Sequence, residues 1–204
     1  MPGPVSARSA ATPCYGAPSP RPRAPVLDLL PWIPAVVVGL TGLIVVIDAL
    51  RLGAPPMPSS PAARRALVAL LPERPDLEAH ELGAGWGGLA VAVARARPTW
   101  RVVAWEAAWV PFAFLWVRRR IFGPRNLTVR RGDWMQAPLD RTDVITAYLL
   151  PDAMLRLRDA LEARGRPGAC LLSVHFGVRG WSPDRASVLR DRHRTRVLRY
   201  RVPA

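Results

Sequence analysis

The sequence contains no lysine, so its 29 strongly basic side chains are all arginines. Acidic residues number 15, which gives a formal net charge of +14 at pH 7. The arginines are spread along the chain and are not gathered into one motif. We therefore do not expect a nucleic-acid partner, and we expect a solvated basic face that can also lie against anionic lipid.

Cysteine and histidine are scarce as well. Cys14 lies in a proline-rich tail and Cys170 in an apolar run, so the two do not form a disulfide framework, and a reducing compartment is indicated. His80, His175 and His193 share no metal-ligand spacing with each other or with a cysteine pair. The sequence predicts no metal site.

Charge is also absent from one long stretch near the N-terminus. Residues 1–25 are rich in proline and are predicted to be disordered. From Leu29 to Ile47 there are 19 residues without a charge, which as a helix would be roughly 28 Å long, close to the thickness of a bilayer core. We predict one transmembrane helix within residues 26–50 and a Pro-rich linker at 51–61. A buried core helix is the alternative interpretation.

Residues 62–204 alternate between strand and helix patterns. This alternation predicts an α/β fold with a Rossmann-like, mostly parallel, seven-stranded sheet, closed by a C-terminal antiparallel hairpin. The predicted strands are Leu77–Leu82, Trp100–Glu106, Leu127–Arg131, Asp143–Leu149, Ala169–Val174, Ser187–Arg190 and Thr195–Val202. The predicted helices are 61–71, Trp86–Ala96, Val110–Arg120 and Pro151–Arg164.

A glycine-rich loop follows the first predicted strand and opens the next helix, as nucleotide-binding loops do. Gly83, Gly85 and Gly88 fit the dinucleotide pattern GxGxxG, while Glu81 with Gly83, Gly85 and Gly87 fits the E/D-x-G-x-G-x-G pattern of methyltransferases. A carboxylate at position 81 can hold the ammonium of a methionine moiety, but it would repel a pyrophosphate. The loop therefore favours S-adenosylmethionine (SAM) as the cofactor.

Two acidic residues follow the next two strands. Glu106 lies 23 residues after Gly83 and can accept hydrogen bonds from both hydroxyls of a ribose. Asp133 follows the third strand, where it can recognise the edge of adenine or can simply form an Asx turn. NAD-binding folds use an acid like Glu106 in the same way, but the chain has no Tyr-x-x-x-Lys pair of short-chain reductases.

Residues that follow the fourth strand are candidates for the reaction site, since open α/β sheets bind ligands at the carboxyl ends of their strands. They run from Tyr148 through Pro151 to Asp152. Tyr148, with Trp134, can form a dry aromatic channel that lowers the pKa of an entering lysine by desolvation. Asp152 can then accept the proton late in the reaction.

Residues 53–204 resemble class I SAM-dependent methyltransferases. More narrowly, the chain resembles the small membrane-anchored protein-lysine methyltransferases that act on the adenine nucleotide translocase and the ATP synthase c-subunit, together with their bacterial relatives. The resemblance rests on the N-terminal hydrophobic segment, the glycine loop, Glu106 followed by Trp109, the Tyr-Leu-Leu-Pro stretch at 148–151, and Gly180-Trp181. The chain departs from the family pattern at two places. Gly88 stands where the family has a basic or polar residue, and Ala107-Ala108 stand where the family has a polar residue, Asn and Pro before the tryptophan.

The resemblance implies a SAM-dependent methyltransferase tethered to a membrane. Because SAM is found in the cytoplasm, we expect the catalytic domain on the cytoplasmic side, with a bacterial inner membrane as the membrane concerned. It implies transfer to the lysine nitrogen of a membrane-associated protein; a small or lipidic acceptor, or a catalytically silent nucleotide-binding module, stays open as an alternative. The implied cofactor-binding residues are Glu81, Gly83, Ala84, Gly85, Gly87, Glu106 and Asp133. The candidate catalytic residues are Tyr148, Pro151 and Asp152.

Overall fold

The computed structural model describes residues 30–53 and 57–204. The chain divides into two units, residues 1–38 and residues 39–204. The predicted disordered tail at 1–25 lies outside the described residues. So do the first residues of the predicted transmembrane segment and part of the predicted linker.

A single 3-10 turn, η1 (Leu30–Trp32), leads into helix α2 (Ile33–Leu52). Residues Leu30–Leu52 form a 23-residue stretch that is long and apolar enough to cross a membrane by length and composition. No described residue of α2 is buried, which speaks against the core-helix interpretation. The helix continues past Asp48, where the apolar run ends, because no helix breaker occurs before Gly53, whose φ is +66°.

The described part of the second unit contains a seven-stranded sheet with the order β3-β2-β1-β4-β5-β7-β6. The first five strands in this order are parallel, and β7 is antiparallel to both β5 and β6. This confirms the Rossmann-like α/β fold and its C-terminal antiparallel hairpin. The strands are β1 (Glu78–Leu82), β2 (Arg101–Glu106), β3 (Leu127–Arg131), β4 (Val144–Ala147), β5 (Cys170–Val174), β6 (Arg185–Val188) and β7 (Arg196–Arg201).

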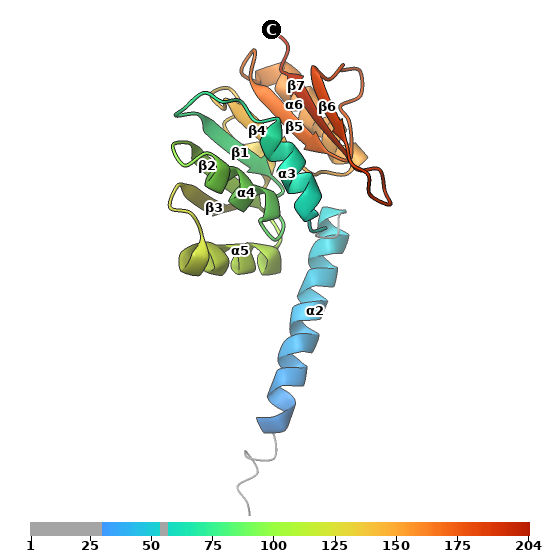
Figure 1. Cartoon of the computed structure of the whole chain (residues 1–204). Coiled ribbons are helices and arrows are strands. Elements are labelled where there is room, and N and C mark those ends of the chain that lie inside the picture. The colour runs from blue at the N-terminus through green and yellow to red at the C-terminus, as the bar shows by residue number, and fades with distance from the viewer. Residues whose placement is uncertain (1–29, 54–56) are drawn as a thin grey trace, which may run out of the picture. The chain divides into compact units, whose positions relative to one another are not determined.

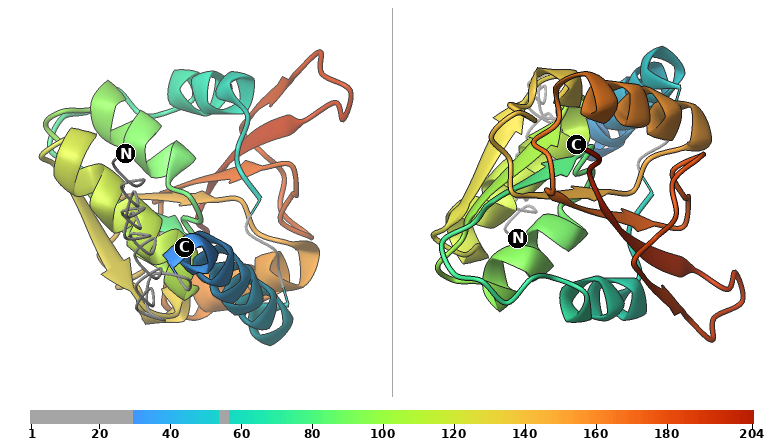
Figure 2. Two further views of the ribbon diagram at one scale, coloured as in Figure 1. Left: turned by 90° about the horizontal axis from the view of Figure 1, so that it is seen from below. Right: turned by 90° about the horizontal axis from the view of Figure 1, so that it is seen from above.

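Helices cover both faces of this sheet, as Figure 1 and the view from above in Figure 2 show. One face packs against α3 (Pro61–Ala69), α4 (Gly88–Ala96) and α5 (Trp109–Phe122), and the other packs against α6 (Pro151–Arg164). Two apolar clusters result, one on each side of the strands. Because both faces are covered, the central strands are buried almost throughout.

Local sequence signals explain where the helices begin and end. The Ser60 hydroxyl accepts a hydrogen bond of 3.1 Å from the Ala63 amide, and Pro61 occupies the first helical position of α3. Pro151 occupies the same position in α6. Helix α5 continues two residues beyond the predicted end at Arg120 and stops at Gly123.

Two strands differ from the prediction by two residues, while the other strand ends agree to within one residue. Strand β4 ends at Ala147 and not at Leu149, because the chain leaves the sheet to place Leu150 as the N-cap of α6. Strand β6 covers Arg185–Val188 and not 187–190, with its register fixed by pairing to β7. At β6 the residues are mixed in polarity and carry no clear period, whereas at β4 the apolar run continues to Leu150 and gives no sign of where the strand ends.

Candidate functional site

The glycine loop between β1 and α4 adopts a left-handed backbone at three positions. Gly83, Gly85 and Gly87 have φ values of +71°, +53° and +75°. A Cβ atom on Gly87 would lie 2.0 Å from Cδ1 of Leu115, so α5 packs directly against the bare backbone at this point. The loop therefore requires glycine at residue 87 for its conformation and for the approach of α5.

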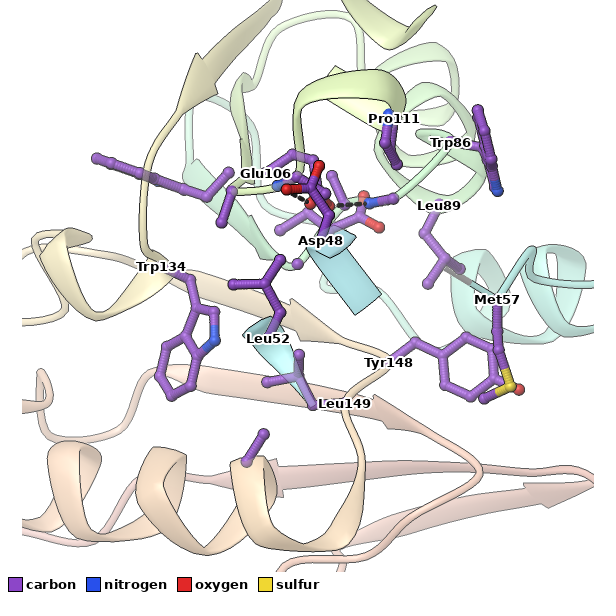
Figure 3. Close-up of a pocket in the computed structure, with 18 of the residues that line it drawn as sticks. Asp48, Leu52, Met57, Trp86, Leu89, Glu106, Pro111, Trp134, Tyr148 and Leu149 are labelled. Carbon is purple, nitrogen blue, oxygen red and sulfur yellow. Dashed lines mark hydrogen bonds between the residues drawn. The ribbon is translucent and has the colours of Figure 1, made fainter. Parts of the chain in front are cut away.

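Glu106 fixes the loop from the end of the neighbouring strand. Its Oε2 accepts a hydrogen bond of 2.6 Å from the Gly85 amide, and its Oε1 accepts one of 2.8 Å from the Ala108 amide. Glu106 is buried, and this burial raises the pKa of its carboxyl, while the amides of Ala108 and Gly85 oppose the shift. The carboxylate thus organises the loop and lines the pocket at the same time (Figure 3).

Glu81 lies at the base of the same pocket and is also buried. Burial raises the pKa of its carboxyl well above the usual range, and the charge of Glu106 adds to the shift. The Ala90 amide and Arg64 oppose it. Its Oε2 is a buried atom for which the described residues provide no hydrogen-bond partner. A buried acceptor without a partner is costly, and this one is next to a space that a ligand can enter.

A polar network explains why β1 is less apolar than its neighbours. The Trp105 Nε1–H group donates to Nδ1 of His80 over 3.0 Å, and Nε2 of His80 lies 2.7 Å from Oε1 of Glu78. Burial lowers the pKa of His80, so the neutral tautomer that accepts from Trp105 and donates to Glu78 is favoured. These polar residues hold Trp105, which lines the pocket.

Asp133 forms the Asx turn that was one of its two interpretations, and its role at the edge of adenine stays a prediction. Its Oδ1 accepts a hydrogen bond of 2.9 Å from the Met135 amide, which is an Asx turn that caps the short helix η2 (Trp134–Gln136). Asp133 and Trp134 also line the pocket. The guanidinium of Arg156 lies 5.6 Å from the ring centroid of Trp134. One face of the Trp134 ring therefore lies against a cation.

The segment after β4 forms the opposite wall of the pocket. Tyr148, Leu149 and Leu150 line it, and Figure 3 shows the side chains of Tyr148 and Leu149 among the lining residues. Pro151 and Asp152 are exposed in the first turn of α6 and are not among the lining residues. The structure therefore brings Tyr148 to the pocket and leaves the other two candidate catalytic residues outside its walls; their predicted roles stay predictions.

Arg64 and Ser59 line the pocket, although neither is among the site residues predicted from the sequence. The Arg64 Nε–H group donates to the carbonyl oxygen of Ser59 over 3.0 Å. A Cβ atom on Gly88 would lie 2.7 Å from Oγ of Ser59 and 3.0 Å from Nε of Arg64. These two side chains therefore take up the space next to Gly88, which explains the absence of a side chain there. No local sequence signal connects Arg64 with the loop, since the contact depends on how α3 packs beside α4.

Comparison with known sequences identifies two similarities. A family model described as the ANTKMT methyltransferase domain matches residues 81–185, just over half of the chain. A protein-lysine N-methyltransferase of Saccharolobus islandicus (strain REY15A) is 27% identical over 64 residues, which is 31% of this chain and 40% of that protein. The match therefore spans less than half the length of this relative.

Comparison with solved structures identifies the same fold. An RNA methyltransferase from Salinibacter ruber in complex with S-adenosyl-L-homocysteine superposes with a TM-score of 0.63 and 25% identity, covering 72% of this chain and 94% of that one. A precorrin-6y C5,15-methyltransferase from Geobacter metallireducens GS-15 gives a TM-score of 0.58 at 14% identity, covering 74% and 93%. The second likeness shows the fold alone.

Proposed function

The chain belongs to the family of the ANTKMT methyltransferase domain, and from this premise we propose that it transfers a methyl group from SAM to a lysine nitrogen of a membrane-associated protein. The observation that carries the proposal is the pair of buried carboxylates at the carboxyl ends of β1 and β2, which face one pocket around a left-handed glycine loop. The relative named as a protein-lysine N-methyltransferase supports the choice of acceptor.

The pocket's residues fit this cofactor. The buried Oε2 of Glu81 has no hydrogen-bond partner among residues 30–53 and 57–204, which suits the cationic end of a methionine moiety. Glu106 is held in place by two amides, and each of its oxygens keeps a lone pair that can accept from a ribose hydroxyl. Asp133 and Trp134 would bind the adenine. Gly83 and Gly85 would let the ligand approach the backbone closely.

Bound SAM would supply a methyl group that its sulfonium already activates. The chain's part is to align an acceptor nitrogen and to exclude water, which is catalysis by proximity and orientation. The half-buried wall formed by Tyr148, Leu149 and Leu150 suits this role. An apolar wall also lowers the pKa of an entering lysine, so that the neutral amine is available to react.

The acceptor is proposed to be a membrane protein because α2 has the length and composition of a membrane span. A span of this kind would confine the chain to a bilayer and concentrate it near membrane substrates. Since SAM is made and kept in the cytoplasm, we place the catalytic domain on the cytoplasmic side, with the bacterial inner membrane as the membrane concerned.

The test is methyl transfer from labelled SAM by the purified full chain, incubated with a membrane fraction from the same cells. We expect labelled methyllysine in hydrolysed membrane protein, and this product cannot be automethylation because the chain contains no lysine. Label in the lipid extract or in RNA, with none in protein, would contradict the lysine acceptor. Absence of label from every fraction would contradict methyl transfer itself.

The cofactor site is tested separately by calorimetry with Glu106→Gln. Loss of charge-assisted hydrogen bonds at Glu106 should weaken SAM binding by about 2 kcal/mol. Glu73→Gln is the matched control, since Glu73 is exposed and does not line the pocket. Equal affinities of the two variants for SAM would show that Glu106 does not bind the cofactor.

A further inference from the structure

Helix α5 exposes an unusual number of large apolar side chains. Only Pro111 and Leu115 are buried among its 14 residues. Six large apolar side chains are between 46% and 74% exposed: Trp109, Phe114, Trp116, Val117, Ile121 and Phe122. A surface helix of a soluble domain places its apolar residues against the core. Most of those of α5 point away from it.

Five of these six side chains form one continuous face, and Phe122 lies on the opposite side of the helix. At 100° per residue, Trp109, Trp116, Val117, Ile121 and Phe114 follow one another around about half of the helix, opposite the line that carries Pro111 and Leu115. The face therefore runs along the full length of α5, on the side away from β2 and β3. In Figure 1, α5 lies at the outer edge of the described part of the domain. Asp48 of α2 reaches its beginning, where it accepts a hydrogen bond of 2.8 Å from the Trp109 amide.

The charges on α5 are of one sign. Arg118, Arg119 and Arg120 are consecutive, and the helix has no acidic residue. Arg118 donates to the carbonyl oxygen of Trp86 and Arg119 to that of Leu127, so these two are tied to the domain. Arg120 is exposed and lies within the apolar face itself.

We propose that α5 is an interfacial helix that binds the surface of an anionic lipid bilayer. Tryptophan and phenylalanine on one face, with arginines beside them, are the composition of helices that lie in the plane of the membrane interface. The stem of Arg120 can lie along the apolar face while its guanidinium reaches a lipid phosphate. The net charge of +14 favours the same partner.

A second copy of the chain is a poorer occupant of this face. In a two-fold interface the same surface meets itself, so each Arg120 would approach the arginines of the facing helix. With no carboxylate on α5 to offset them, these like charges would oppose the contact. Lipid phosphates supply the missing negative charge.

Lipid binding by α5 also has a consequence for the pocket. Glu106 and Trp109 are three residues apart, and the Trp109 ring stacks with Arg131, whose guanidinium lies 3.8 Å from its centroid. Ala108 and Pro111, on either side of Trp109, line the pocket, so the beginning of α5 is part of its rim. An α5 that lies on a bilayer would bring this rim to the membrane surface. The lipid contact does not depend on methyl transfer.

The test measures the depth of single spin labels in the full chain reconstituted into vesicles that mix phosphatidylcholine with anionic phosphatidylglycerol. The background is Cys14→Ser, with Cys170 left in place because it is buried. Ile121→Cys reports on α5, Ala163→Cys on the exposed side of α6, and Leu43→Cys on α2. Collisions with oxygen, which partitions into lipid, are compared with collisions with a water-soluble nickel chelate.

We expect the oxygen-to-nickel collision ratio at residue 121 to rise well above that at residue 163. Adding Arg120→Glu should lower the equilibrium constant for insertion of α5 into the bilayer by about fivefold or more. Arg190→Glu, the same change on the exposed hairpin, should leave this constant unchanged. A label at 121 that behaves like the one at 163 would overturn the proposal. Shielding from both reagents would overturn it too, in favour of a contact between copies. The label at 43 reports on the α2 anchor independently.

Discussion

At the scale of single residues, the feature that governs the site is a pair of buried carboxylates, Glu81 and Glu106. Burial raises the pKa of both, and most strongly that of Glu81. A carboxyl group whose pKa is higher in the folded than in the unfolded state stabilises the fold while it is protonated. This contribution is complete below the pKa of the unfolded state, near 4.5, and is lost as the pH rises through the pKa of the folded state. The cofactor-free chain should therefore become less stable from about pH 4.5 upward.

Glu81→Gln tests this dependence. The amide removes the cost of a buried charge, so the variant should melt at a higher temperature than the parent at about pH 8 and at nearly the same temperature at about pH 4.5. Thermal unfolding of the cofactor-free chain across this range measures it. A parent and variant with parallel pH profiles would show that Glu81 does not titrate as described. The same substitution should weaken SAM binding, since the ammonium loses its carboxylate.

His80 stabilises the fold through its contacts with Trp105 and Glu78. His80→Leu leaves the buried Nε1–H group of Trp105 without an acceptor, so we expect a loss of about 2 kcal/mol in the free energy of unfolding. Trp105→Phe in the same chain removes that donor. The double variant should be less destabilised than the sum of the two single variants, as measured by denaturant unfolding. Strict additivity would argue against the hydrogen bond.

The sequence predicts those site residues whose positions depend on their spacing within one short stretch of the chain. Glu81, the glycines and Glu106 follow a pattern that one strand, one turn and the next strand bring together. Arg64 and Ser59 carry no such pattern, because their approach to Gly88 depends on packing between α3 and α4. Trp105 and His80 form a contact between neighbouring strands, and their pairing depends on the register of β1 against β2.

At the scale of elements, the glycine loop, α4 and α5 act as one unit. Gly87→Ala would place a methyl group against Leu115 and force a left-handed alanine, so we expect a loss of about 3 kcal/mol or more. Gly85→Ala is the control, because it has a similar φ but open space around it, and it should cost about 1–2 kcal/mol. Thermal unfolding of both variants measures the difference. Equal losses would show that α5 does not pack closely on the loop.

The elements themselves were predictable because the sheet is covered on both faces. Continuous apolar runs such as Cys170–Val174 indicate buried parallel strands and were placed to within a residue. Prediction was poorer at the end of β4 and at β6. The apolar run of β4 continues past the strand, which ends where the N-cap of α6 begins. The residues of β6 are mixed in polarity, and its boundary depends on pairing with β7.

At the scale of the whole molecule, the proposed membrane residence depends on α2. Leu40→Arg together with Ile44→Arg should prevent insertion, since each arginine near the centre of a span costs about 3 kcal/mol. The double variant should be released from membranes by alkaline carbonate, while the parent and a Leu40→Ala, Ile44→Ala control remain bound. Release of the parent under the same conditions would contradict the anchor.

The order of strands in the sheet differs from their order in the chain. Strand β7 is made after β6, yet it lies between β5 and β6. While the ribosome is still adding residues up to Thr195, the outer edge of β5 has no neighbour, and β6 has nothing to pair with. An apolar strand with an open edge can pair with the same strand of another nascent chain. Emergence of β7 ends this exposure, so premature termination just before it would yield an aggregating fragment and not a smaller stable domain.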